Sequence, residues 1–247
     1  DAQIGQDGKM YFLTGGRGTQ SAMWRVSYTG NESVKPVEYQ NKELALMDVE
    51  AATKALSSED RVERYSARVA LEVQAPETFN SILLNKLRSR TDWNVITSAI
   101  GLARTGDSDQ GRLILSALAS MDWAGLSEAQ QLAWLRAVSL TFVRLGEPDE
   151  AMRAKVLGVI DTQYPAESDV LNRELCRVLS YLQAPNVVSR TLTLMDAAGP
   201  TPTPDWLELA ERNDRYGRTV KNMIANLPPE QVIHYVYCLR VVKGPWK

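Results

Sequence analysis

The sequence is poor in the side chains that most often build catalytic and metal sites. Its 247 residues include one histidine, His234, and two cysteines, Cys176 and Cys238. A structural zinc site usually takes four Cys or His ligands, so a site built from these ligands alone is nearly excluded. Neither a CxxC nor a CxxCH motif occurs, and covalent haem attachment within this chain is therefore not indicated. We predict no cofactor-binding or metal-binding residue in the chain itself.

Strong net charge and long apolar runs are also missing. The formal net charge is −2 at pH 7, which gives no domain-wide basic character, so we expect no nucleic-acid binding. No apolar run approaches the roughly 20 residues of a membrane-spanning helix. The start Asp1-Ala2-Gln3 has no initiator Met and no apolar segment of a signal peptide. We interpret the chain as a processed product or as a fragment of a longer one.

The two cysteines lie in apolar runs with helical character, ELCRVL around Cys176 and VYCLRV around Cys238. Cysteine is among the most frequently buried residue types, so the preferred interpretation is two small buried hydrophobic residues. A disulfide between them is the alternative if the protein works in an oxidising compartment.

The first thirty residues predict a β-hairpin. Residues 9–14 and 21–28 are rich in aromatic and apolar side chains, and the glycine-rich residues 15–18 lie between them as a turn. An isolated hairpin is marginal in water, so we expect 1–30 to pack on the helical part or on strands that this chain lacks. Residues 31–42 are polar and predict a linker.

Residues 43–247 predict helices almost throughout. Ser127 and Gln130 have the spacing of a capping box, and glycine and proline residues separate the periodic segments, most clearly in 199–204. About ten helices with short connections favour stacked pairs of irregular period, that is, a HEAT-like α-solenoid. A compact all-α bundle is the main alternative.

The stretch 168–195 shows this pattern best. Its apolar residues recur at spacings of four and three on one helical face, and Ala184-Pro185 divides the stretch into two helices. Asn172 and Arg173 lie in the first turn of the first helix. We predict that they form a structural clamp that binds the backbone of a neighbouring loop.

His234, Tyr235 and Tyr237 are the only candidates for a catalytic site. A histidine beside tyrosines is able to act as a general base, and some all-α polysaccharide lyases use Tyr and His together. No partner acid or base is evident in the sequence. A structural histidine that bonds between two helices is the favoured interpretation, and we assign no catalytic residue.

Five segments of the sequence carry a family resemblance: DGKMYFLTGGRGTQSAMWRVSYTG, RYSARVALE, MDWAGLSEAQQL, YPAESDVLNRELCRVLSYLQAP and PPEQVIHYVYCLRVVKGPW. Together they resemble one family of large secreted bacterial proteins, the PVC-type haem-binding or membrane-bound-dehydrogenase-type proteins. In this family a β-propeller comes first, a HEAT-like helical region follows, and a cytochrome c module with a CxxCH motif often ends the chain. The resemblance covers nearly the whole chain, and residues 172–176 and 231–235 are its most specific parts.

The resemblance implies an architecture and a compartment. Residues 1–30 correspond to the end of a propeller and residues 43–247 to the HEAT-like domain, in a periplasmic or extracellular protein. The full propeller and the haem motif are missing, so the redox activity of the family is not transferred to any residue. Haem c is expected only in a further domain or in a partner.

The leading hypothesis is therefore a non-catalytic helical scaffold or protein-interaction segment of a larger dehydrogenase-like or cytochrome-like redox protein, a parent oxidoreductase. Its partners would be other domains or subunits, such as the propeller and the cytochrome c. The alternative is an independent all-α enzyme that acts on polysaccharide through His234 and Tyr235 or Tyr237. A third possibility is a subunit that associates with cytochromes carried by other chains.

Overall fold

The computed structural model describes residues 2–16, 19–33, 47–200, 202–212, 217–244 and 246. The chain divides into two compact units, 1–45 and 46–247. Most of the predicted linker 31–42, and the predicted start of the helical region at residue 43, lie outside the described residues. The two units are described separately below.

The first unit contains a three-stranded antiparallel sheet in the order β1-β2-β3. The strands are β1 (Ala2–Ile4), β2 (Met10–Gly16) and β3 (Thr19–Val26). The predicted hairpin is confirmed as β2 and β3, but Gly15 and Gly16, predicted in the turn, belong to β2. Strand β1 was not predicted because a three-residue strand is too short to show alternation.

One face of this sheet is apolar. Residues that pair across antiparallel strands point to the same side of the sheet. Beside the polar Thr14, the pairs place one group of apolar side chains on this face: Ala2, Ile4, Met10, Phe12, Ala22, Trp24 and Val26. We call this group the apolar sheet face. Its Phe12 and Trp24 rings stack with their centroids 6.4 Å apart, and Trp24 Nε1 donates to Thr14 Oγ1 at 2.8 Å.

The second unit is helical, with the following helices within its described residues: α1 (Val49–Ala55), α2 (Arg61–Glu72), α3 (Pro76–Lys86), α4 (Asp92–Thr105), α5 (Gly111–Ala119), α6 (Glu128–Leu145), α7 (Glu150–Ile160), α8 (Asp169–Tyr181), α9 (Val187–Ala197), α10 (Leu207–Glu211), α11 (Gly217–Ala225) and α12 (Glu230–Leu239). The fold class is mainly α, as predicted. None of the helices in the described part of the chain has the length and apolar content that a membrane crossing requires.

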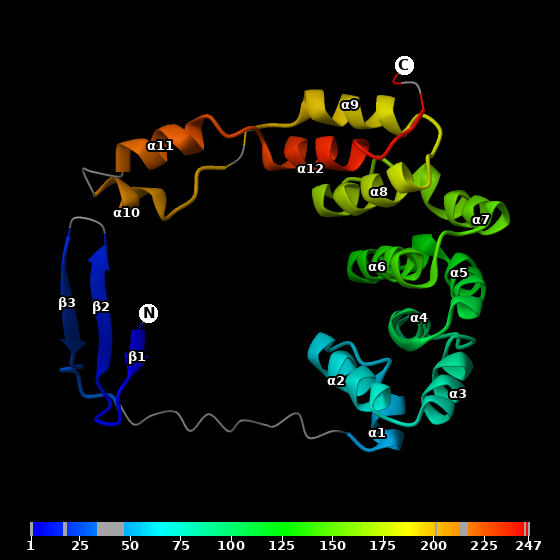
Figure 1. The fold of residues 1–247 in the computed structure, drawn as a ribbon, viewed down its shortest axis with the longest axis horizontal. Coiled ribbons are helices and arrows are strands. Elements are labelled where there is room, and N and C mark those ends of the chain that lie inside the picture. The colour runs from blue at the N-terminus through cyan, green and yellow to red at the C-terminus, as the bar shows by residue number, and fades with distance from the viewer. Residues whose placement is uncertain are drawn as a thin grey trace. The chain divides into compact units, whose positions relative to one another are not determined.

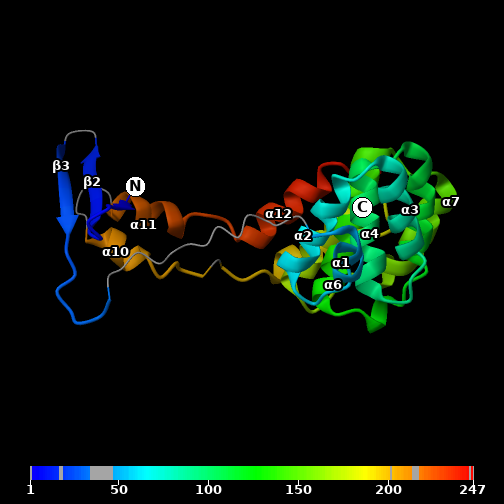
Figure 2. The same ribbon diagram turned by 90° about the horizontal axis from the view of Figure 1, so that it is seen from below.

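Most of these helices stack in two rows, while α10 and α11 pack on each other. Helices α2, α4, α6, α8 and α12 contact one another in that order, while α3, α5 and α7 form the second row (Figure 1). Figure 2 looks along this stack, so that α2, α4 and α6 overlap while α3 and α7 stand beside them. Helix α4, for example, packs on α3 and α5 of the second row and on α2 and α6 of its own row.

Several helices begin where the sequence provides a capping side chain. Asp60 accepts hydrogen bonds from the backbone N–H groups of Val62 and Glu63 at the start of α2. The predicted capping box of α6 is confirmed, since the Ser127 hydroxyl accepts from Gln130 N and the Gln130 side chain accepts from Ser127 N. These bonds satisfy donors that have no partner within the helix.

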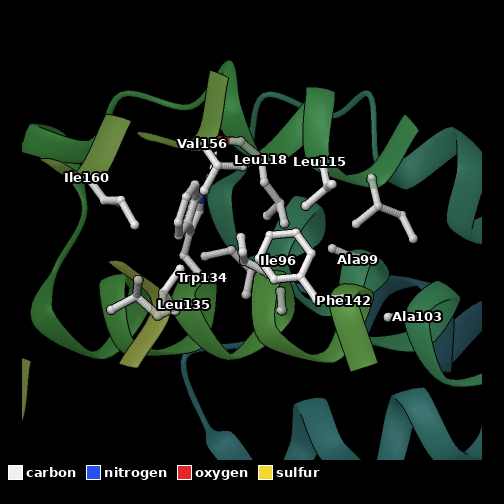
Figure 3. Close-up of a cluster of buried hydrophobic side chains, with 14 of the residues drawn as sticks. Ile96, Ala99, Ala103, Leu115, Leu118, Trp134, Leu135, Phe142, Val156 and Ile160 are labelled. Carbon is white, nitrogen blue, oxygen red and sulfur yellow. Dashed lines mark hydrogen bonds between the residues drawn. The ribbon is translucent and has the colours of Figure 1, made fainter. Parts of the chain in front are cut away.

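The core runs continuously between the two rows of helices. Its centre lies between α4, α5, α6 and α7, where Trp134 is fully buried (Figure 3). Trp134 packs edge-on against Trp123, with ring centroids 5.3 Å apart. Trp134 Nε1 donates to the backbone oxygen of Leu118 at 2.9 Å. This bond satisfies the polar atom of a side chain that is otherwise surrounded by apolar groups.

Replacing the central tryptophan tests the packing of this core. We expect Trp134→Ala to lower the free energy of unfolding by about 3–5 kcal/mol, because it opens a cavity and removes the hydrogen bond to Leu118. The matched control on the same helix is Val143→Ala, whose side chain is 79% exposed and whose replacement should change it by less than about 0.5 kcal/mol. Urea unfolding followed by circular dichroism measures both, and similar losses in the two variants would contradict the placement of Trp134.

Candidate functional site

The residues singled out in the sequence come together where α8, α9 and α12 contact one another. At the start of α8, the Asn172 side chain binds both the backbone N–H and the backbone C=O group of Ala166. Its Oδ1 accepts from Ala166 N at 2.7 Å, and its Nδ2 donates to Ala166 O at 2.8 Å. The predicted clamp is confirmed for Asn172, which holds the segment before α8 against the helix.

His234 links α12 to α8. Its Nε2 lies 3.2 Å from the backbone oxygen of Arg173, so the ring donates to a carbonyl in the tautomer that carries its proton on Nε2. Burial lowers the pKa of His234 below its usual range, and the bond to Arg173 only partly opposes this effect. The ring is therefore neutral at neutral pH and serves as a hydrogen-bond donor between two helices.

The two tyrosines beside His234 have separate partners. Tyr235 is buried, and its hydroxyl accepts a bond of 2.7 Å from Gln231 Nε2, which also donates to the backbone oxygen of Asp169. Tyr237 is 61% exposed, and Arg240 lies over its ring and donates to its hydroxyl. No hydrogen bond between these described residues joins His234 to either tyrosine.

A groove of about 450 Å³ opens beside Tyr235, between the starts of α8 and α12 and the proline-rich segment after α9. Its charged residues include Arg173 and Glu230, which form an ion pair of 2.8 Å. Burial raises the pKa of Tyr235, so the phenol is protonated at neutral pH. The groove is lined by both polar and apolar residues.

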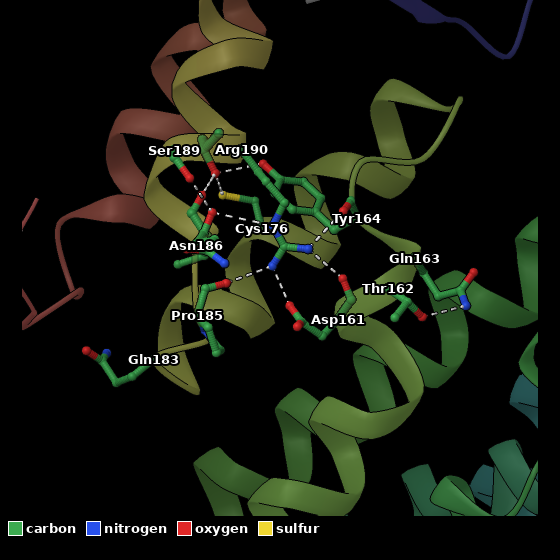
Figure 4. A network of polar contacts seen from close by, with 12 residues as sticks. Asp161, Thr162, Gln163, Tyr164, Cys176, Gln183, Pro185, Asn186, Ser189 and Arg190 are labelled. Carbon is green, nitrogen blue, oxygen red and sulfur yellow. Dashed lines mark hydrogen bonds and ion pairs between the residues drawn. The ribbon is translucent and has the colours of Figure 1, made fainter. Parts of the chain in front are cut away.

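A network around Arg190 was not found from the sequence. The Arg190 guanidinium donates to the backbone oxygens of Asp161, Tyr164 and Pro185, and it forms an ion pair with the Asp161 side chain (Figure 4). It thereby ties the loop between α7 and α8 to the start of α9. An arginine within an ordinary amphipathic helix gives no sequence signal for such a role.

A small buried polar cluster lies beside this network. The hydroxyls of Tyr164 and Thr191 are 2.8 Å apart, and Thr191 Oγ1 donates to the backbone oxygen of Val187 at 2.6 Å. The sulfur of Cys176 lies 3.6 Å from Thr191 Oγ1. Cys176 and Cys238 are both buried, and both are free thiols, as the interpretation of small buried residues requires.

Two findings concern a possible metal site and the relation of the chain to known proteins. Within the described residues, no group of three or more His, Cys, Asp or Glu side chains is placed to hold a metal ion. Comparison of the chain with protein-family models, curated proteins and solved structures found no match.

Replacing the clamp residue tests whether it is structural. We expect Asn172→Ala to lower the free energy of unfolding by about 2 kcal/mol, because the half-buried N–H and C=O groups of Ala166 lose their partner. The control is Arg177→Ala on the same helix, which removes only an exposed ion pair with Glu174 and should cost less than about 1 kcal/mol. Thermal unfolding compares the two variants, and an equal or smaller loss in Asn172→Ala would contradict the clamp.

The pKa of His234 gives a pH dependence of stability. The folded protein resists protonation of His234 while the unfolded chain protonates near its ordinary pKa of 6.5. The unfolded state thus binds more protons in the window just below that value, and stability falls as the pH is lowered through it. His234→Gln removes this contribution while keeping a hydrogen-bond donor.

Urea unfolding of the wild type and of His234→Gln between about pH 7.5 and pH 5 measures the effect. Because the chain has no other histidine, the difference in slope between the two proteins belongs to His234. We expect the wild type to lose more stability on acidification. An equal or steeper loss in His234→Gln would contradict this assignment.

Proposed function

We propose that this chain is a helical scaffold or protein-interaction segment, and that it serves a larger protein or complex instead of catalysing a reaction itself. The observation that carries the proposal is the apolar sheet face in the first unit. Trp24 is 53% exposed, Ile4 is 58% exposed and Val26 is 45% exposed. The described residues of this unit, 2–16 and 19–33, contain no element that covers the face.

A three-stranded sheet with an exposed apolar face needs a partner that covers this face. A sheet of three strands becomes stable when its apolar face packs on another layer, and large exposed apolar patches mark interaction sites. The opposite face also exposes Leu13 and Met23, which are 71% and 70% exposed. Apolar side chains on both faces suit a sheet enclosed between two neighbours, as in the blades of a β-propeller.

The helical unit supports the same proposal. Helix α2, which begins the row of α2, α4, α6, α8 and α12, exposes Val62 and Tyr65, and α12, which ends that row, exposes Ile233, Val236 and Tyr237. A stacked array of this kind presents extended surfaces to other proteins. The candidate catalytic residues, by contrast, bond to the backbone or to neighbouring side chains of their own helices.

The family resemblance names the partners that we propose. They are a β-propeller next to the sheet and a cytochrome c module, with haem c bound there and not in this chain, in a periplasmic or extracellular oxidoreductase. The parent protein would use the helical array to hold these parts at a fixed spacing.

Hydrogen exchange in the native protein tests the proposal. We expect the amides of β2 and β3 to exchange at least roughly 100-fold more slowly in the native, full-length polypeptide than in the isolated chain of residues 1–247, because the covered sheet opens less often. Mass spectrometry of the same native sample identifies the peptides that lie outside this chain. Propeller and CxxCH peptides are expected among them.

Two variants of the native protein locate the covered surface. Trp24→Lys places a charge on the apolar sheet face and should abolish the protection of β2 and β3. Gln20→Lys changes an exposed residue near the hairpin end and should leave the protection intact. Equal exchange in the native and isolated forms would refute the proposal.

A further inference from the structure

The two cysteines of the chain lie far apart in the sequence but meet in the fold. Cys176 is on α8 and Cys238 is on α12, and these two helices pack directly on each other. Cys176 is 0% exposed and Cys238 is 5% exposed. Their thiols interact with each other, and this interaction is the largest single influence on the pKa of each thiol. No other cysteine competes for either partner.

The surroundings distinguish the two thiols. Cys176 lies in the polar cluster, with Thr191 Oγ1 at 3.6 Å and Ser180 Oγ at 3.9 Å. The S–H group of Cys238 lowers the pKa of Cys176, against the opposing effect of burial. The Cys176 sulfur in turn raises the pKa of Cys238, and burial raises it further. Ser180 and Thr191 belong to α8 and α9, so their hydroxyls still face Cys176 when α12 separates from α8 and can donate to a thiolate there, which makes Cys176 the attacking group.

We propose that Cys176 and Cys238 are a disulfide-forming pair that joins α12 covalently to α8 when the protein meets an oxidant of the disulfide class. The Cys176 thiolate attacks one sulfur of the oxidant disulfide, forms a mixed disulfide and releases the other sulfur as a thiolate. The Cys238 thiolate then attacks the Cys176 sulfur and displaces the second sulfur of the oxidant. The two protein thiols are oxidised, the oxidant is reduced to two thiols, and the two protons pass to the released thiolates.

Burial of the pair determines when this exchange takes place. A disulfide oxidant cannot reach thiols that are 0% and 5% exposed in the packed structure, so it reacts when α12 separates from α8 or before α12 docks. The bond then prevents that separation. It closes a loop that contains α9, α10 and α11 and fixes one wall of the groove beside Tyr235. The inference is independent of the proposed scaffold function, because it depends only on contacts inside the helical unit.

The test uses the wild-type protein, purified in reduced form and then incubated with oxidised and reduced glutathione. Free thiols are alkylated after unfolding, and peptides are analysed without reduction. We expect one bond within the chain between the Cys176 and Cys238 peptides, with native helicity by circular dichroism. The oxidised form should have a Tm higher than the reduced form by roughly 5 °C or more, and dithiothreitol should reverse the shift.

Two single variants assign the order of the steps. Cys238→Ser should stop at a mixed disulfide between Cys176 and glutathione, whereas Cys176→Ser should leave the Cys238 thiol free for alkylation. The wild-type comparison needs no variant and stands even where a variant fails to fold. Two free thiols in the folded wild type after incubation, or bonds only between chains, would refute the proposal.

Discussion

The burial of apolar faces between successive helix pairs is the interaction on which the rest of the helical unit depends. A single pair cannot cover its own apolar stripe, so α4 needs α6, and α6 needs α8. Trp134 shows how far this dependence goes, since it is fully buried and its indole N–H bonds to the end of α5. Apolar side chains stay exposed on α2 and α12, the ends of the described row, and also on α6 within it, where Val143 is 79% exposed.

The stacking also explains where the polar side chains go. Helices that pack this closely leave their connecting loops with buried backbone groups, and each such group needs a partner. Asn172 and Arg190 provide partners for the loop before α8 and for the start of α9. His234 does the same for the backbone oxygen of Arg173. Asn172, Arg190 and His234 are thus bound to the backbone of the array.

The sequence predicts the parts of the fold that depend on local signals. Capping residues such as Ser127 and the break at Ala184-Pro185 place helix ends correctly, and the 3.6-residue periodicity gives the class. It does not predict strand β1, which is too short, or the role of Arg190, whose partners lie on a distant loop. The contact of Cys176 with Cys238 depends on how α12 packs on α8, and no local pattern encodes that packing.

The two units differ in how far they bury their apolar side chains, and this difference is the strongest argument for the proposed function. The helical unit buries many of its leucine and alanine side chains in one continuous core. The sheet places Ile4, Trp24 and Val26 on one face and exposes all three. Exposed apolar residues do not stabilise an isolated sheet, because a strand with one apolar face is stabilised by the burial of that face. The proposal that the sheet forms one layer of a larger β-structure is based on this exposure.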